Sequence, residues 1–340
     1  MQHLLDQGPL LNEEGNLTES GYAFSLIKKY SRDAIKAPAM RIKEWDYYYV
    51  GNNHVGVALT VADNAYMSLV GATVFNFDKA YDKTKNVMGL LPKGKIMMPS
   101  SSASGDVIFN TKDFSFHFTH ENGRRHLVCE MKNFDGEKPF RCDIYLEETI
   151  KDSMVIATPF NKPKHFYYNQ KINLLKANGY AKVGDETYDL SKDTWGVLDW
   201  GRGVWTYSNT WYWSSMSGTY KGKKIGFNLG YGFGDTSAAS ENMFFYDDKA
   251  YKFEDVKFDI PIASNGNDDF LKPWKFRSKT GDISLTFEPI LDRFSNTNAL
   301  IIKSIQHQVF GKFHGYFVIE GKQVYFEDIL GFAEKVRNCW

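Results

Sequence analysis

The chain has 340 residues, of which 43% are hydrophobic and 16% aromatic, and its 41 basic side chains balance 41 acidic ones. This composition suffices for a large core and excludes a disordered chain, while the balanced charge disfavours nucleic acid and anionic membrane surfaces as partners. The first residues lack the basic start and apolar run of a signal peptide, and no apolar stretch has the length of a membrane span. We therefore expect a soluble, cytoplasmic protein.

The N-terminal region contains the best candidate for a helix. Between Glu19 and Lys36, apolar residues recur at roughly helical spacing, Ser20 is a candidate cap, and Pro38 follows the end of the segment. We expect one short helix here, before the strands begin.

From Ile42 onward, short runs separated by turn residues predict strands, and alternation is plain in Phe114–Thr119. Turns recur every eight to twelve residues, so we expect a mainly β fold, an antiparallel sandwich or barrel, rather than an α/β fold. The expected strands of the first half are 44–50, 54–61, 65–77, 105–109, 114–120, 126–132 and 140–148.

The second half repeats this pattern, which suggests two β units. The loosest region is 151–164, which contains two prolines, so we place the boundary between residues 154 and 200. The expected units are 1–190, with the leading helix, and 191–340; within the second unit, 327–334 is expected to be a short helix or a loop. Its expected strands are 210–220, 223–229, 242–245, 249–258, 283–289, 304–310, 313–319 and 323–326.

Several common catalytic and metal-binding patterns are missing from the sequence. Cys129, Cys142 and Cys339 have no metal-ligand spacing, and their odd number argues against a disulfide framework, so we expect buried thiols. The histidines form no closely spaced set, and the serines no Gly-x-Ser-x-Gly elbow. Metal sites and covalent serine or cysteine catalysis are therefore not expected.

The segment from Asp193 to Trp213 contains five of the eight tryptophans, with two aspartates, one arginine and three glycines. Tryptophans interleaved with charges are typical of the wall of a pocket or an interface. Asp199 and Arg202 could pair with each other or hold a ligand, and a buried ion pair that braces a corner of the fold explains them equally well. On a strand, Trp211 and Trp213 would point to one face.

The glycine-rich segment 226–235 lacks the surroundings of a dinucleotide or phosphate site. Its glycines are better explained by a strand that passes under bulky aromatic side chains and then bulges. Asp235 and the nearby Glu241 would then reach the mouth of a pocket, although solvated loop charges are a simpler explanation of each one.

Residues 167–173 read as a strand with polar groups on both faces. Tyr168, Gln170 and Ile172 would share one face, and Tyr167, Asn169 and Lys171 the other. Gln170 and Lys171 are both candidates to reach the cavity, and a surface position is the simpler explanation of the lysine.

The order of these motifs resembles a known family. Tyr-Tyr-Asn-Gln-Lys171, Asp193-Thr-Trp-Gly, Asp199-Trp-Gly-Arg-Gly-x-Trp205 and Trp211-Tyr-Trp213 resemble an uncharacterised bacterial family catalogued as a domain of unknown function, over most of the chain. More distantly, the chain is similar to the superfamily of hydroxyneurosporene synthase (carotenoid hydratase) and AttH-like proteins, to which fungal decalin-forming Diels–Alderases are also similar. The resemblance implies two lipocalin-like β-barrels with a ligand cavity between or within them.

The chemistry implied by the resemblance agrees with the residues. An alkene hydratase or cyclase needs a protonated carboxylic acid in an apolar site and aromatic faces that stabilise a cation. Asp199 or Asp193 would serve as the acid, Arg202 would orient a polar group or tune an aspartate, and no metal or organic cofactor is required.

Three functions remain open: an acid–base hydratase, cyclase or isomerase; a small-molecule binding protein without chemistry; and a glycoside-cleaving enzyme with paired carboxylates. The partner would be a hydrophobic, amphipathic or saccharide small molecule. The catalytic candidates are Asp199, Asp193, Asp235 and Glu241. The candidate ligand-binding residues are Arg202, Trp195, Trp200, Trp205, Trp211, Trp213, Tyr168, Gln170, Lys171 and Asn228.

Overall fold

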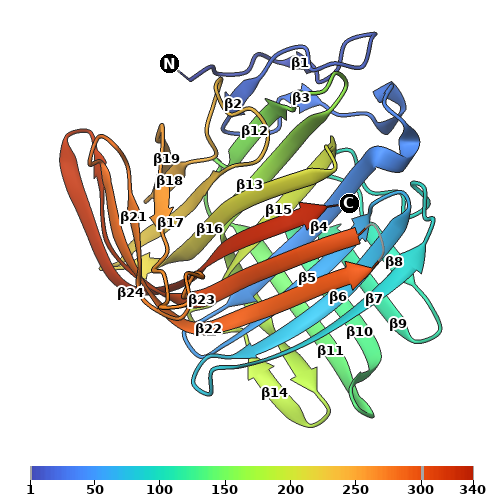
Figure 1. Cartoon of the computed structure of the whole chain (residues 1–340). Helices are drawn as coiled ribbons and strands as arrows, with labels where there is room; N and C mark the ends of the chain where they lie inside the picture. Colours follow the sequence, from blue (N-terminus) through green and yellow to red (C-terminus); the bar gives the residue numbers. More distant parts are fainter. Residues whose placement is uncertain (1, 300–301, 340) are drawn as a thin grey trace.

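Most of the described residues form strands. A computed structural model describes residues 2–299 and 302–339, and it consists mainly of two curled antiparallel sheets that face each other (Figure 1). The expected mainly β fold is confirmed. None of the helices in the described residues is long and apolar enough to cross a membrane.

The first sheet has thirteen strands in the described part of the chain. Three of them, β2 (Gly21–Ala23), β12 (Met154–Pro159) and β14 (Glu186–Asp189), branch from the main path, β12 and β14 by pairing with β13 and β2 by pairing with β12. The main path runs β7 (Tyr81–Leu90), β6 (Met67–Asn76), β5 (Val55–Asp63), β4 (Ile42–Gly51), β15 (Trp195–Val204), β13 (Phe166–Val183), β11 (Lys138–Glu148), β10 (Arg124–Asp135), β9 (Phe114–Glu121) and β8 (Val107–Asn110).

The second sheet begins where the first ends in the sequence. The segment 327–334 is part of β24, so the expectation of a helix or loop there is wrong; residues 329–334 are all buried, which removes the alternation that marks a strand. The strand order is β19 (Lys249–Lys252), β18 (Met243–Tyr246), β17 (Lys223–Tyr231), β16 (Ser208–Tyr220), β24 (Lys322–Cys339), β23 (Ile302–Ile319), β22 (Ile283–Ala299), β21 (Trp274–Arg277) and β20 (Lys257–Asp259).

The helix expected between Glu19 and Lys36 is not formed. This region contains β2, the short strand β3 (Lys28–Lys29), which pairs with β1 (Gly8–Pro9), and a single 3₁₀ turn at Arg32–Ala34. A second 3₁₀ turn spans Ala39–Arg41. Pairing of β2 with the edge of β12 satisfies backbone groups that a helix would have satisfied internally, so tertiary contacts override the helical spacing.

The chain crosses from the first sheet to the second between Val204 and Ser208. This point lies just beyond the expected boundary range of 154–200, because β15 inserts between β4 and β13 of the first sheet. The tryptophan-rich segment therefore belongs to both sheets. A division of the chain into two structural units at this crossing remains a proposal.

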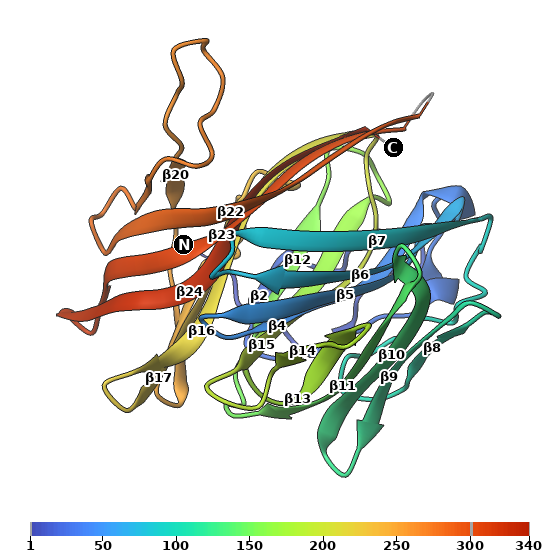
Figure 2. The same cartoon turned by 90° about the horizontal axis from the view of Figure 1, so that it is seen from below.

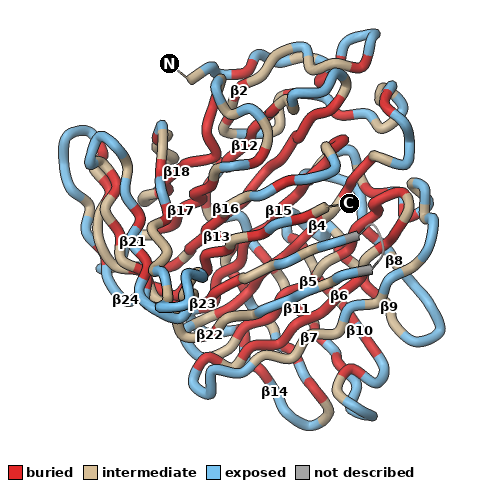
Figure 3. The backbone as a smooth tube through the Cα atoms, viewed as in Figure 1, coloured by how far each residue is buried: buried red, intermediate tan, exposed pale blue. Residues whose placement is uncertain are grey.

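Aromatic side chains fill part of the space between the sheets. Phe75 of β6 packs on Phe310 of β23 with ring centroids 4.4 Å apart, and Tyr49 of β4 contacts Phe332 of β24 at 5.7 Å. At one side β22 runs beside β7, as Figure 2 shows, and at the other β13 contacts β16 and β17. Buried residues follow the middle of both sheets, and exposed residues mark the hairpin ends (Figure 3).

The three cysteines are free thiols, and the expectation that they are buried is correct for two of them and wrong for Cys339. Cys129 and Cys142 are buried directly opposite each other on β10 and β11, and Cys339 is partly exposed.

Candidate functional site

A cavity of about 330 Å³ lies between the two sheets. The first sheet contributes side chains from β4, β5, β6, β7, β13 and β15, and the second from β16, β22, β23 and β24, so the site exists only when both sheets are in place. The lining residues with aromatic or ionisable groups are Trp45, Tyr47, Asp82, Tyr167, Lys171, Asp199, Trp205, Trp211, Tyr212, Trp213, Phe233, Glu241, Arg293, Phe294 and Glu334.

The alternation of β15 decides which part of the central motif reaches this cavity. Asp199 faces the cavity, whereas Trp200 and Arg202 face the opposite side of the sheet. Gly201 shares the face of Asp199, and the ring of Trp45 lies directly on it: a Cβ at Gly201 would be 1.9 Å from Cζ2 of that indole. The glycine is thus required for Trp45 to form part of the wall.

Five aromatic rings form one continuous wall. Trp45 stacks on Tyr167, with ring centroids 5.9 Å apart and planes 7° apart, and meets Trp205 edge-on at 5.0 Å. Phe233 contacts Tyr167, Trp205 and Trp211 edge-on at 4.8 to 5.3 Å. These offset and edge-to-face arrangements are the favoured ones, so the wall is rigid and apolar.

Asp199 is held at one oxygen. Its Oδ1 accepts hydrogen bonds from Nζ of Lys171 at 2.8 Å and from Nδ2 of Asn169 at 2.6 Å. Lys171 is only 3% exposed and its ammonium lies 3.8 Å from the ring centroid of Trp213, so the surface position considered for this lysine is wrong. The second oxygen of Asp199 receives no hydrogen bond from the described residues, which leaves it available to a ligand.

Two further carboxyl groups share this end of the cavity. Glu334 on β24 accepts hydrogen bonds from Trp211 Nε1 at 2.8 Å and from Gln308 Nε2 at 3.2 Å, and burial raises its pKa to about 7. Burial also raises the pKa of Glu241, against the opposing effect of Lys171. Both glutamates interact electrostatically with Lys171 and with Asp199, although only Asp199 forms an ion pair with that ammonium among the described residues, so one cation is shared by three carboxyl groups of the same cavity.

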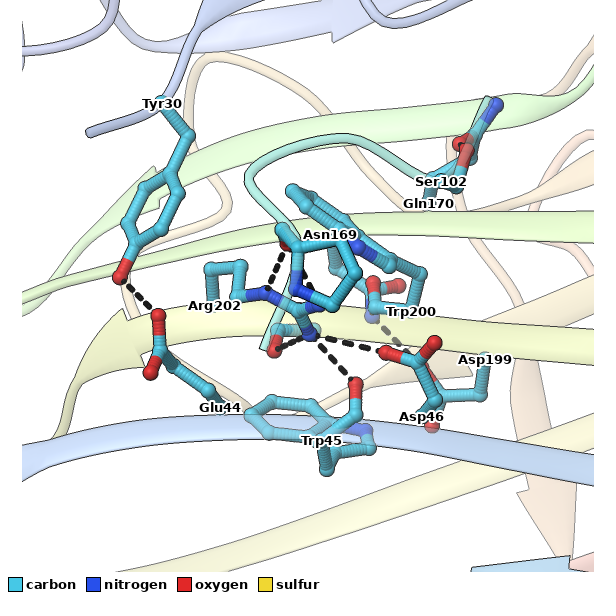
Figure 4. A network of polar contacts seen from close by, with 12 residues as sticks. Tyr30, Glu44, Trp45, Asp46, Ser102, Asn169, Gln170, Asp199, Trp200 and Arg202 are labelled. Atoms are coloured by element: carbon cyan, nitrogen blue, oxygen red, sulfur yellow. Dashed lines mark hydrogen bonds and ion pairs between the residues drawn. The ribbon is translucent and has the colours of Figure 1, made fainter. Parts of the chain in front are cut away.

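Asp199 and Arg202 do not pair with each other, which was one of the two alternatives considered, because residues three apart on a strand face opposite ways. Arg202 is fully buried and forms an ion pair with Asp46 at 3.0 Å (Figure 4). It also donates to the carbonyl oxygens of Trp45 and Pro99 and lies over the ring of Trp200. This group joins β4, β15 and the loop before β8 behind the cavity.

The other candidate residues lie outside the cavity. Asp193 is an exposed turn residue and lines, with Trp195, a second hollow of about 230 Å³. Asp235 is exposed, and the backbone N–H of Ser237 lowers the pKa of its carboxyl group by donating to it.

Three more candidates lie behind the walls of the cavity. Tyr168 and Gln170 share the face of Trp200, as the alternation predicts, and the amide of Gln170 contacts Ser153 and Ser102. Asn228 lies behind Trp213, whose Nε1 donates to its Oδ1 at 2.7 Å.

Of the predicted residues, the structure brings together Asp199, Glu241, Lys171, Trp205, Trp211 and Trp213. It adds Glu334, Trp45 and Arg293, which were not identified from the sequence. Glu334 lies in the segment expected to be a helix or loop, so its side chain could not be assigned to a face. Strand alternation in 44–50 puts Trp45 and Tyr47 on one face, but only the pairing of β4 with β15 places them beside Asp199.

Among residues 2–299 and 302–339, no group of three or more histidine, cysteine, aspartate or glutamate side chains is arranged to hold a metal ion. Asp199, Glu241 and Glu334 therefore do not form a metal-ligand set in this conformation.

Comparison with solved structures finds proteins of similar fold. A candidate AttH of Nitrosomonas europaea matches with a TM-score of 0.54 and 11% identity over 92% of this chain and 98% of that chain, which shows a shared fold and confirms the expected similarity. Kievitone hydratase of Nectria haematococca has a TM-score of 0.49 and 11% identity over 98% of both chains. CghA has a TM-score of 0.42 and 8% identity, over 98% of this chain and 97% of that one. No curated protein matches the sequence significantly, whereas one family model matches residues 1–340.

Proposed function

Since the chain belongs to the family described as Domain of unknown function (DUF2804), a description that states no activity, we propose a function from the cavity itself. The protein is an acid–base enzyme that hydrates, cyclises or isomerises a small amphipathic molecule. The acid and the base are carboxyl groups of the chain.

One observation carries this proposal: Asp199, Glu241, Glu334 and Lys171 line one cavity beside an aromatic wall, where Lys171 pairs with Asp199 and acts electrostatically on both glutamates. Three carboxylates cannot all be charged at low cost next to one cation in a poorly hydrated site. Environments that separate the protonation of neighbouring carboxyl groups are the arrangement that acid–base catalysis uses.

The contacts favour different roles for the three groups. Glu334, with a pKa of about 7, is a general acid that holds its proton in part of the molecules at neutral pH, where a catalytic acid is most effective. Asp199 is assigned as the base, because its Oδ1 is paired with Lys171 while its second oxygen faces the cavity and receives no hydrogen bond from the described residues. Glu241, with its raised pKa, is a second acid.

The size of the cavity supports a small ligand. Pockets for small molecules usually span about 300 to 1,000 Å³ and are mainly apolar with a few polar groups, and a cavity of about 330 Å³ lies in that range. The same walls would suit a protein that binds its ligand without changing it, so the experiment must separate the two.

The test is comparative mass spectrometry of a small-molecule extract from cells that naturally produce the protein. The extract is incubated with the wild-type protein, with Glu334→Gln, and with Glu327→Gln, a matched control at an exposed glutamate on the same strand. We expect one compound to decrease while a product appears that is either isomeric or heavier by one water.

Glu327→Gln should convert the compound at the wild-type rate, and Glu334→Gln should be slower by a factor of about 100 or more, the usual contribution of general acid catalysis. Native mass spectrometry of the same samples detects any bound molecule. A compound that is retained but never changed would refute the enzyme and favour a binding protein.

A further inference from the structure

Acidic groups outnumber basic ones in the wall of the cavity. Among the described lining residues, the only lysine or arginine side chains are Lys171 and Arg293. Lys171 is already paired with Asp199, and Arg293 donates to Gln308 and Thr84. The four carboxyl groups of the wall belong to Asp82, Asp199, Glu241 and Glu334.

We infer that the cavity selects its ligand by charge: it takes an amphipathic organic cation, such as a protonated amine, in preference to a neutral molecule of the same shape, and it rejects carboxylates. This inference rests on the proposed function, since it names the class of ligand for the same cavity. It concerns binding, so it can be tested without turnover.

Free acceptor oxygens are the first support. The Oδ1 atom of Asp199 receives both hydrogen bonds made to that carboxylate, and its Oδ2 receives none from the part of the chain that is described. Glu241 is 7% exposed, and the described residues form no ion pair with its carboxyl group within 4 Å. An ammonium group of a ligand would donate to the free oxygen of Asp199 and would place a positive charge beside Glu241.

The aromatic wall is the second support. The ammonium of Lys171 lies 3.8 Å from the ring centroid of Trp213, so one indole of this cavity already holds a cation against its face. Indole rings attract ammonium groups through their negative faces, and the attraction is stronger where water is excluded. Trp45, Trp205 and Trp211 present further indole surface to the same space.

Proton linkage is the third support. Glu334 is surrounded by the neutral donors Trp211, Gln306 and Gln308, and the charges that act on it are those of Lys171 and Asp199. Burial raises its pKa to about 7. A cation placed nearby would lower this pKa again, so binding of an amine near pH 7 would release protons.

Glu241 would respond in the same direction. The groups that act on it are Lys171, Lys252 and Asn228, which favour its charged form, and Asp199, which opposes it. Burial is the largest effect and raises the pKa, so an added positive charge would also release protons from this carboxyl group.

The experiment compares three probes that share one skeleton: phenethylamine, phenethyl alcohol and phenylacetate. Binding to the full-length protein is followed by tryptophan fluorescence and by calorimetry in two buffers of different ionisation enthalpy, which measures proton release. We expect the amine to bind about tenfold more tightly than the alcohol and phenylacetate more weakly than both. The amine should release protons at pH 7 from the wild-type protein and from Glu327→Gln, and fewer from Glu334→Gln.

Equal affinities for the amine and the alcohol would overturn the inference, as would tightest binding of phenylacetate or no binding of any probe at millimolar concentration. The probe series on the wild-type protein decides this even if Glu334→Gln fails to fold. If the probes show no preference for the amine but a neutral compound of the extract is converted, the inference about charge is refuted and the proposed enzyme is not. If the amine binds selectively but no compound is converted, only the proposed enzyme is refuted.

Discussion

Replacing Glu334 by glutamine should change how stability depends on pH. The pKa of this group rises from an ordinary value of 4.5 to about 7 in the folded protein, chiefly through burial. Between these values the folded protein keeps a proton that the unfolded chain has lost, so stability falls as pH rises through this window. The difference between the two pKa values, at about 1.4 kcal/mol per pH unit, corresponds to a loss of about 3 kcal/mol in the free energy of unfolding. Glu334→Gln has no such proton and should not show this loss.

The assay is urea unfolding of both proteins at several pH values from 4.5 to 8, which gives the free energy of unfolding at each. The glutamine can keep the hydrogen bond from Trp211. Any hydrogen bond lost to Gln308 costs about 1 kcal/mol at every pH, so it lowers the free energy of unfolding equally at all pH values and does not change its pH dependence. The wild type should lose about 3 kcal/mol relative to the variant across this range, and Glu327→Gln should follow the wild type. Parallel curves for the wild type and Glu334→Gln would refute the perturbed acid on which the proposed function depends.

Three other predictions follow from the packing. Gly201→Ala places a Cβ 1.9 Å from the Trp45 ring and should lower the free energy of unfolding by about 1 to 3 kcal/mol; most of this loss should disappear in a Trp45→Ala background, and an equal loss there would contradict the assigned clash. Arg202→Met leaves Asp46 buried without its cation and should cost about 3 to 5 kcal/mol in urea unfolding, whereas Arg141→Met, at an exposed ion pair, should cost less than about 1 kcal/mol. A thiol reagent should modify Cys339 alone in the native protein and all three cysteines after unfolding; rapid native labelling of more than one thiol would contradict the buried positions of the other two.

Much of the fold follows from local sequence patterns. The period of two in segments such as 114–120 leads directly to a mainly antiparallel β fold, because a strand presents alternate side chains to a buried and an exposed face. The same rule separates Tyr167 and Lys171 from Tyr168 and Gln170, and the structure confirms this division. It fails where both faces are buried, as in 329–334, and where distant pairing competes with helical spacing, as in 19–36.

Part of the candidate site also follows from local sequence, and part of it does not. The sequence by itself identified the tryptophan-rich segment and Asp199, because such residues are unusual together and their spacing is local. Only the tertiary structure decided that Asp199 pairs with Lys171 rather than with Arg202, and that Glu334 joins it from a strand more than one hundred residues away. These contacts depend on the order of the strands and on the way the two sheets face each other, because both bring distant residues into one poorly hydrated space. No local pattern in the sequence encodes that arrangement.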